Sequence, residues 1–202
     1  MKHNYKFTEH WFDGMIPNWE IIFKHYTKPI NRVLEIGCYE GRATTWLCEN
    51  VLNDNIIFDV IDTFVGPVNE SGGTKTINKL KEEVNFIENN FNHNISFFTN
   101  ISFNVYKDFS QKVLPTFDDI PIYDFIYIDA SHRSDDTFVD AYYAHKLLKS
   151  GGLLIFDDYR WKDNNDMRRV NSPELAIDMF YIMYKELYNI LFKGYQIGFI
   201  KK

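Results

Sequence analysis

The sequence lacks the features that mark membrane and secreted proteins. It has no run of about 18 apolar residues, and its N-terminus has no uninterrupted apolar stretch, so neither a membrane span nor a signal peptide is expected. Cysteine is scarce: Cys38 and Cys48 suit neither a metal-binding spacing nor a disulfide framework. We therefore expect a cytoplasmic protein with no membrane partner.

Positive charge is also scarce. The chain has 22 Lys and Arg residues against 28 Asp and Glu residues, a net charge of −6, and no dense Lys/Arg block. A surface that follows a phosphate backbone needs such a block, so no nucleic-acid partner is expected.

The chain does have enough apolar material for one domain. Of its 202 residues 45% are hydrophobic and 17% are aromatic. This length and composition suit a single domain with a full core. Part of the aromatic excess is expected in that core, and the rest could line a pocket for a flat or apolar ligand.

Short β-branched segments alternate with longer helical stretches, a pattern typical of βαβ units in a parallel sheet. The predicted strands cover residues 32–36, 56–61, 95–99, 123–128 and 152–156. Helices are predicted at about residues 41–51, 76–91, 103–113 and 134–149. A last helix is expected after Ser172, its N-cap, with Pro173 in the first turn. The pattern predicts an α/β protein.

The two ends of the chain differ from this pattern. The C-terminal "YNILFKGYQIGFIKK" predicts a β-hairpin with a two-residue turn at Lys193 and Gly194, and hence an antiparallel strand. Residues 1–30 predict one or two amphipathic helices outside the sheet, which serve as a cover or a lid. Residues 31–202 form the α/β domain.

The segment "VLEIGCYEGRATTWL" from Val33 predicts a strand, a glycine turn and a helix, a junction that often cradles a nucleotide-like cofactor. Gly37 and Gly41 lie in the turn. A dinucleotide fingerprint would need glycines at positions 37, 39 and 42, but Tyr39 and Arg42 occupy the last two. A dinucleotide-dependent oxidoreductase is therefore the weaker alternative.

Acidic residues stand at the ends of four predicted strands. They are Glu35, Asp62, Asp129 and the pair Asp157–Asp158. Ligands of open α/β sheets bind at the carboxyl ends of the strands, so ribose hydroxyls, an ammonium group or a divalent cation would suit these acids. Capping of the following helices is the structural alternative.

Three of these acids and one histidine form a second group. Asp129, Asp157 and Asp158 offer the oxygen ligands that Mg²⁺ prefers, with solvation in an open cleft as the alternative. His132 follows Asp129 by three residues and is a candidate general base, or a residue that only orders its loop.

The chain resembles the class I S-adenosylmethionine-dependent methyltransferases, and most of all the methyltransferase 24 group related to macrocin O-methyltransferases. Three segments carry the resemblance: "VLEIGCYEGRATTWL", "VIDTFVG" and "FIYIDASHRSDDTFVDAYYAHKLLKSGGLLIFDDY". It implies a Rossmann-like, seven-stranded, mostly parallel sheet with helices on both faces and an antiparallel C-terminal hairpin strand. The implied cofactor is S-adenosylmethionine, which has no pyrophosphate and so does not require a glycine at position 39.

The resemblance also implies roles for particular residues. The turn from Gly37 to Gly41, with Cys38 and Tyr39, would wrap the methionine part of the cofactor, and Glu35 would order that turn. The ribose would be held by Asp62, and the next residue, Thr63, would also bind the cofactor. The remaining cofactor contacts would come from Asn100, Ile101 and Ser102 near the adenine, and from Asp129.

On the acceptor side, the resemblance implies methyl transfer to an oxygen of a small molecule. Asp129, Asp157 and Asp158 match the metal ligands of metal-dependent relatives, and His132 with Asp129 would be catalytic. Some relatives carry an acid where this chain has Ser131. The acceptor would lie near Tyr159, Arg160 and Trp161. The resemblance allows a homodimer, and a catalytically silent cofactor-binding protein of the same fold is the other alternative.

Overall fold

The computed structural model describes residues 3–66, 83, 85–162 and 169–202. The strands are β1 (Arg32–Ile36), β2 (Ile56–Ile61), β3 (Ile101–Tyr106), β4 (Tyr123–Ile128), β5 (Leu148–Phe156), β6 (Tyr188–Lys193) and β7 (Ile197–Lys201). The α-helices are α1 (Ile16–His25), α2 (Arg42–Asn50), α4 (Phe86–Ile95), α5 (Ser110–Val113), α6 (Ser134–Leu147) and α7 (Pro173–Tyr184). Short 3₁₀ helices cover Trp11–Met15, Leu114–Thr116, Arg169–Asn171 and Lys185–Leu187.

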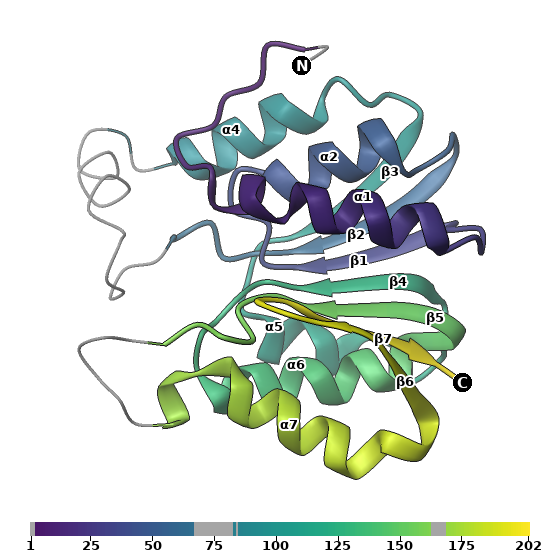
Figure 1. Cartoon of the computed structure of the whole chain (residues 1–202). Coiled ribbons are helices and arrows are strands. Elements are labelled where there is room, and N and C mark those ends of the chain that lie inside the picture. The colour runs from purple at the N-terminus through teal and green to yellow at the C-terminus, as the bar shows by residue number, and fades with distance from the viewer. Residues whose placement is uncertain (1–2, 67–82, 84, 163–168) are drawn as a thin grey trace.

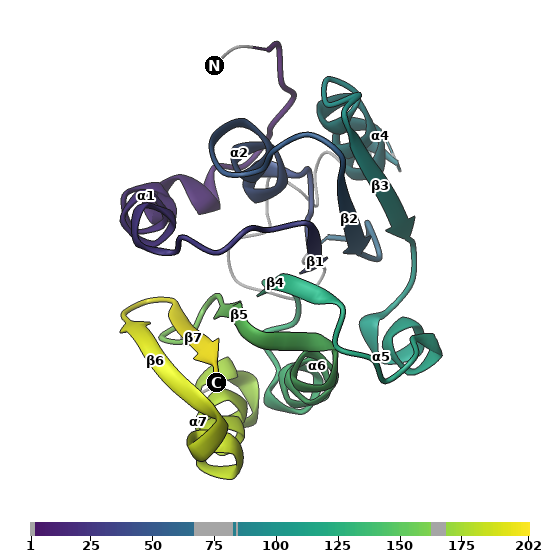
Figure 2. The ribbon, with the colours of Figure 1, turned by 90° about the vertical axis from the view of Figure 1, so that its right-hand side faces the viewer.

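All seven strands join one sheet in the order β3-β2-β1-β4-β5-β7-β6. The pairs β2/β3, β1/β2, β1/β4 and β4/β5 are parallel, whereas β7 is antiparallel to both of its neighbours. Helices α1, α2 and α4 cover one face of the sheet, and α5, α6 and α7 lie on the other (Figures 1 and 2). The predicted α/β fold with an antiparallel C-terminal strand is confirmed.

The core is divided by the sheet into two layers. Trp19, Phe58 and Phe125 are fully buried in the layer under α1, α2 and α4. Leu154 and Phe180 are fully buried in the layer under α6 and α7. Trp19 comes from α1, so the N-terminal helix contributes to the core.

The predicted third strand is wrong. Residues 95–99 close helix α4 and lead into a turn, and the strand is Ile101–Tyr106, which overlaps the helix predicted at 103–113. The two segments read "ISFFT" and "ISFNV", so their local patterns are almost the same. Pairing decides between them, because Ile101 lies opposite Ile56 of β2 while Phe97 stacks on His3 of the N-terminal segment.

Two smaller expectations also change. Lys193 pairs with Ile197, so the hairpin loop consists of residues 194–196 rather than two residues. Helix α7 begins at Pro173 with Ser172 as its N-cap residue, as predicted, but the Ser172 hydroxyl donates to the Trp161 carbonyl (3.2 Å) and makes no capping hydrogen bond to the helix. The predicted helix at 76–91 falls partly outside the described residues.

Gly37 allows the loops after β1 and β4 to touch. Its φ is +84°, and a Cβ at this position would lie 2.0 Å from the Asp129 carbonyl oxygen and 2.8 Å from the Ala130 Cα. Both obstacles are backbone atoms, which cannot rotate away as a side chain could. The loops after two neighbouring strands are therefore in direct contact only because residue 37 has no side chain.

We predict that Gly37→Ala lowers the free energy of unfolding by about 3 kcal/mol, because it combines a backbone clash with a strained φ. Urea unfolding measures this. Gly14→Ala is the matched control, since nothing lies within 4 Å of a Cβ there, and it should change stability by less than about 0.5 kcal/mol. Equal effects of the two variants would contradict the close approach.

Candidate active site

The strand register places the predicted acids at one edge of the sheet. Ile36 lies opposite both Ile61 and Ile128, and Ile128 lies opposite Phe156. The next residue of each strand is therefore level with the others, and these residues are Gly37, Asp62, Asp129 and Asp157. Backbone hydrogen bonds of 2.8 Å join Gly37 N to Ile61 O, Asp129 N to Ile36 O and Asp157 N to Ile128 O. Ligands of open α/β sheets bind at this edge.

Asp62 holds the glycine turn through backbone amides. Its Oδ2 accepts from the N–H groups of Cys38 (2.7 Å) and Tyr39 (2.8 Å), and its Oδ1 accepts from that of Phe64 (2.6 Å). These three bonds fix the Asp62 carboxylate against the turn. Thr63, a further predicted cofactor contact, accepts from Val65 N through its hydroxyl (3.3 Å).

Glu35 lies buried beneath the same turn, at 1% exposure. Its Oε2 accepts a hydrogen bond from the Thr44 hydroxyl (2.6 Å), while its Oε1 is buried with no hydrogen-bond partner among the described residues. Burial and the nearby Asp62 raise the pKa of the Glu35 carboxyl to about 8. An unsatisfied buried oxygen under the turn fits a ligand amine or hydroxyl that completes its hydrogen bonding.

Tyr39 takes the left-handed conformation, with φ of 52°, that a glycine would otherwise supply. Its hydroxyl lies 3.3 Å from the Thr8 hydroxyl, and its ring lies 5.1 Å from that of Trp11. The side chain therefore contacts the N-terminal segment. Glu40, at 1% exposure, fixes this segment further by accepting from the Thr8 backbone N–H (2.6 Å).

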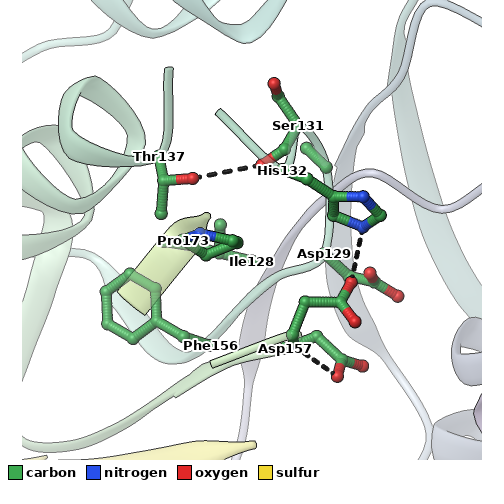
Figure 3. A pocket seen from close by; sticks show the side chains of 10 residues that line it. Ile128, Asp129, Ser131, His132, Thr137, Phe156, Asp157 and Pro173 are labelled. Carbon is green, nitrogen blue, oxygen red and sulfur yellow. Dashed lines mark hydrogen bonds and ion pairs between the residues drawn. The ribbon is translucent and has the colours of Figure 1, made fainter. Parts of the chain in front are cut away.

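The acids after β4 and β5 surround one tyrosine. The buried Tyr127 hydroxyl donates to Asp157 Oδ2 and lies 3.1 Å from Asp129 Oδ2. Burial and the like charges of Asp157 and Asp158 raise the pKa of the Asp129 carboxyl well above its usual range. Burial and Asp158 raise the pKa of Asp157 to about 6. Asp129 and Asp157 line one side of a small pocket (Figure 3).

His132 faces these acids from the loop before α6. Its Nε2 lies 2.7 Å from Asp158 Oδ2. The ring also packs on Trp161, with 4.1 Å between centroids. Asp158 itself has a φ of 54°, an uncommon value for a residue with a side chain, which is often found at functional sites. The structure thus brings together His132, the predicted base, with the acid Asp158 and with Trp161, which was predicted to lie near the acceptor.

The three acids do not form a metal-ligand set as they stand. Among the residues that the structure describes, no group of three or more His, Cys, Asp or Glu side chains is placed to hold a metal ion. The oxygens of Asp157 and Asp158 are already engaged: Asp157 accepts from Tyr127 and Gln196, and Asp158 from Tyr195 (2.8 Å).

Some residues predicted for the site lie elsewhere. Asn100, Ile101 and Ser102 sit at the amino end of β3, because the strand begins at Ile101, so they are at the edge opposite the site. Asn100 there hydrogen-bonds Asp54. Tyr159 is 4% exposed and donates to Asp178 of α7 (2.9 Å), whereas Arg160 is exposed beside it.

Sequence reasoning also missed residues of the site. Tyr127 and Gln196 bind the acids, but they read as an ordinary strand residue and a hairpin residue. The one available signal for Tyr127 is its hydroxyl, a polar group inside an otherwise apolar strand that is expected to be buried and must therefore find a hydrogen-bond partner. The residues that follow β3 at the site's edge are Lys107 and Asp108, which a correct strand assignment would have pointed to.

The fold is that of the class I methyltransferases, and the sequence profile of methyltransferase family 24, a methyltransferase domain, matches residues 34–159. The match covers more than half of the chain, so the chain belongs to this family, as the sequence predicted. No curated protein sequence matches the chain at a significant level.

Solved structures share the fold at low sequence identity. An O-methyltransferase from Bacillus cereus in complex with S-adenosylhomocysteine is 16% identical, with a TM-score of 0.58 over 100% of this chain and 84% of that one. The S-adenosylhomocysteine-bound methyltransferase PaMTH1 of Podospora anserina is 15% identical, with a TM-score of 0.58 over 93% and 78%. TomG of Streptomyces achromogenes, an O-methyltransferase involved in tomaymycin synthesis in complex with S-adenosylmethionine, is 14% identical, with a TM-score of 0.58 over 92% and 80%. No helix among the described residues is long and apolar enough to cross a membrane.

Glu35 gives the site a testable pH dependence. Its folded pKa of about 8 exceeds the ordinary 4.5, so the folded state binds more protons between these pH values, and stability must fall as pH rises through this range. We predict that Glu35→Gln removes this fall, so that its stability relative to the parent rises by on the order of 2 kcal/mol from about pH 5 to about pH 8. Urea unfolding at several pH values checks this, with the exposed Glu20→Gln as control. A Glu35→Gln variant with the parent's pH profile would contradict a buried, protonated Glu35.

Proposed function

We propose that the protein transfers a methyl group from S-adenosylmethionine to a hydroxyl oxygen of a small molecule. The observation that carries this proposal is the pairing of His132 with Asp158 at the same sheet edge as the Asp62-bound glycine turn. One half of this edge suits a ribose and a methionine chain, and the other half suits a hydroxyl group that must lose its proton.

The cofactor half is assigned to the turn between Gly37 and Gly41. The Asp62 carboxylate follows β2 directly and lies beside the turn, where we assign it to a ribose hydroxyl, and Glu35 Oε1 is a buried oxygen beneath the turn with no partner among the described residues. Cys38 and Tyr39 present backbone that Asp62 already orients. The sulfonium of S-adenosylmethionine supplies an electrophilic methyl group, and the chain's part is to bind and orient it.

The acceptor half is assigned to His132 and its partners. A carboxylate only accepts, so His132 donates from Nε2 to Asp158. Asp158 fixes this tautomer and stabilises the imidazolium that forms when His132 takes the acceptor's proton. The acceptor oxygen forms its new bond to the methyl carbon as the carbon–sulfur bond breaks, and S-adenosylhomocysteine leaves.

The acceptor's class is assigned from the surroundings. Trp161 packs on His132, and Arg160 follows Asp158 in the same loop, so an aromatic or sugar hydroxyl, with or without an acidic group, fits the side chains present. The net charge of −6 agrees with a small acceptor rather than a nucleic acid.

The cofactor assignment predicts unequal effects of two substitutions on S-adenosylhomocysteine binding. Asp62→Asn should weaken it at least about tenfold, because an amide N–H₂ would face the backbone N–H donors of the turn. Asn100→Ala should leave it within about twofold, since that residue lies at the opposite edge. Isothermal titration calorimetry measures both. Absence of binding by the parent protein would instead favour a protein that has lost the cofactor site.

The acceptor assignment predicts that His132→Gln lowers methyl transfer at least about 100-fold while S-adenosylhomocysteine affinity stays within about twofold. The assay incubates the protein with S-adenosylmethionine labelled in its methyl group and a panel of phenols, sugars and hydroxy acids. A His132→Gln variant as active as the parent would refute the assigned base. Adding Mg²⁺ or EDTA to the same assay tests the cation that the family resemblance implies, and activity that responds to neither would refute that expectation.

A further inference from the structure

A buried hydrogen-bond chain joins helix α1 to the acids of the candidate site. The Trp19 indole Nε1 donates to Gln196 Oε1 (2.8 Å), and Gln196 Nε2 donates to Asp157 Oδ2 (2.8 Å). Trp19 is 0% exposed and Gln196 is 1% exposed, so water does not compete for these bonds. The first bond spans 177 residues of sequence and connects the N-terminal helix with the C-terminal hairpin.

The chemistry of the partners fixes the direction of the Gln196 amide. An indole N–H can only donate, so the amide oxygen must face Trp19. A carboxylate only accepts, so the amide nitrogen must face Asp157. A flipped amide would place N–H against N–H and oxygen against oxygen, leaving two buried mismatches, each of which is costly. Trp19 therefore determines that Gln196 offers a donor to Asp157.

Asp157 in turn fixes the positions of Asp158 and His132 through hydrogen bonds. Asp157 Oδ1 accepts from the Asp158 backbone N–H (2.7 Å), which holds Asp158 at its unusual φ of 54°. In this conformation the Asp158 carboxylate reaches His132 Nε2 at 2.7 Å. The other carboxylate oxygen of Asp158 is bound by Tyr195, the neighbour of Gln196 in the chain.

We propose that Trp19 and Gln196 are positioning residues, which set the orientation of the His132 imidazole through Asp157 and the backbone turn at Asp158. The N-terminal helix is thus part of the machinery that orders the site, although it contributes no group to it. The effect of Trp19 and Gln196 on catalysis rests on the proposed role of His132 as the base. Their effect on the orientation of the His132 ring does not depend on that role.

The test compares two tryptophan variants. Trp19→Phe removes the indole N–H and keeps an aromatic ring, while Trp46→Phe is the matched control. Trp46 is also buried, its ring lies 5.7 Å from that of Trp19, and no side-chain hydrogen bond of its indole is seen among the described residues. The readout is the ¹⁵N and ¹H NMR signals of the His132 ring in the full chain, assigned with His132→Gln. We expect Trp19→Phe to shift them and Trp46→Phe to leave them unchanged.

A second variant distinguishes the loss of this hydrogen-bond relay, the chain from Trp19 through Gln196 and Asp157 to Asp158, from a general loosening of the core. Gln196→Met keeps the length of the side chain and removes its hydrogen bonds to Trp19, Asp157 and Tyr127, and it should shift the same His132 signals. In the double variant, Trp19→Phe should add nothing to the effect of Gln196→Met, because the relay is already broken. Additive shifts, unmoved His132 signals in Trp19→Phe, or equal shifts in Trp46→Phe would each overturn the proposal.

Turnover gives an independent readout once an acceptor is found. Trp19→Phe and Gln196→Met should lower kcat about fivefold or more and leave the KM for S-adenosylmethionine unchanged, because the disturbed group is the base and not the cofactor turn. If the protein shows no methyl transfer, the proposed function fails but the NMR comparison still decides the relay. If methyl transfer is found and kcat is unchanged in both variants, the positioning role is refuted.

Discussion

The contact between Gly37 and the backbone of Asp129 is the constraint on which the site depends. Strands β1 and β4 are neighbours at the point where the strand order reverses, and the loops that follow them would normally diverge. Here they touch, because the missing Cβ of Gly37 leaves room for the Asp129 carbonyl. The turn that Asp62 holds and the loop that carries Asp129 and His132 are therefore in direct backbone contact at this edge.

Crowding of negative charge at this edge is offset by hydrogen-bond donors, each supplied from a different part of the fold. Backbone amides serve Asp62, the Tyr127 hydroxyl and the Gln196 amide serve Asp157, and His132 serves Asp158. The Tyr127 oxygen also lies 3.1 Å from Asp129 Oδ2, but its proton is donated to Asp157. Burial and the charges of Asp157 and Asp158 raise the pKa of the Asp129 carboxyl well above its usual range, at the point where the two loops meet.

The sequence was sufficient where a feature depends on local pattern. Continuous apolar runs predicted the strands at 32–36, 56–61 and 123–128, and the acids directly after such runs could be assigned to one edge because parallel strands end together. The prediction failed for β3, because "ISFFT" and "ISFNV" have nearly the same local pattern. What distinguishes them is pairing with β2, where Ile101 lies opposite Ile56. Hydrogen bonds such as that from Trp19 to Gln196 join segments 177 residues apart, and no local pattern encodes them.

The N-terminal segment connects with both halves of the edge through separate contacts. Thr8 bonds Glu40 and Tyr39 in the glycine turn, and Trp19 bonds Gln196 behind the acids. Tyr39 at a position that would favour glycine is explained by the first contact, because its side chain has a partner in this segment. Loss of the segment would remove a donor from Glu40 and another from Gln196, both of which are buried at 1% exposure. Since buried polar groups without partners are costly, the segment and the edge stabilise one another, and the order of the site is a property of the whole chain.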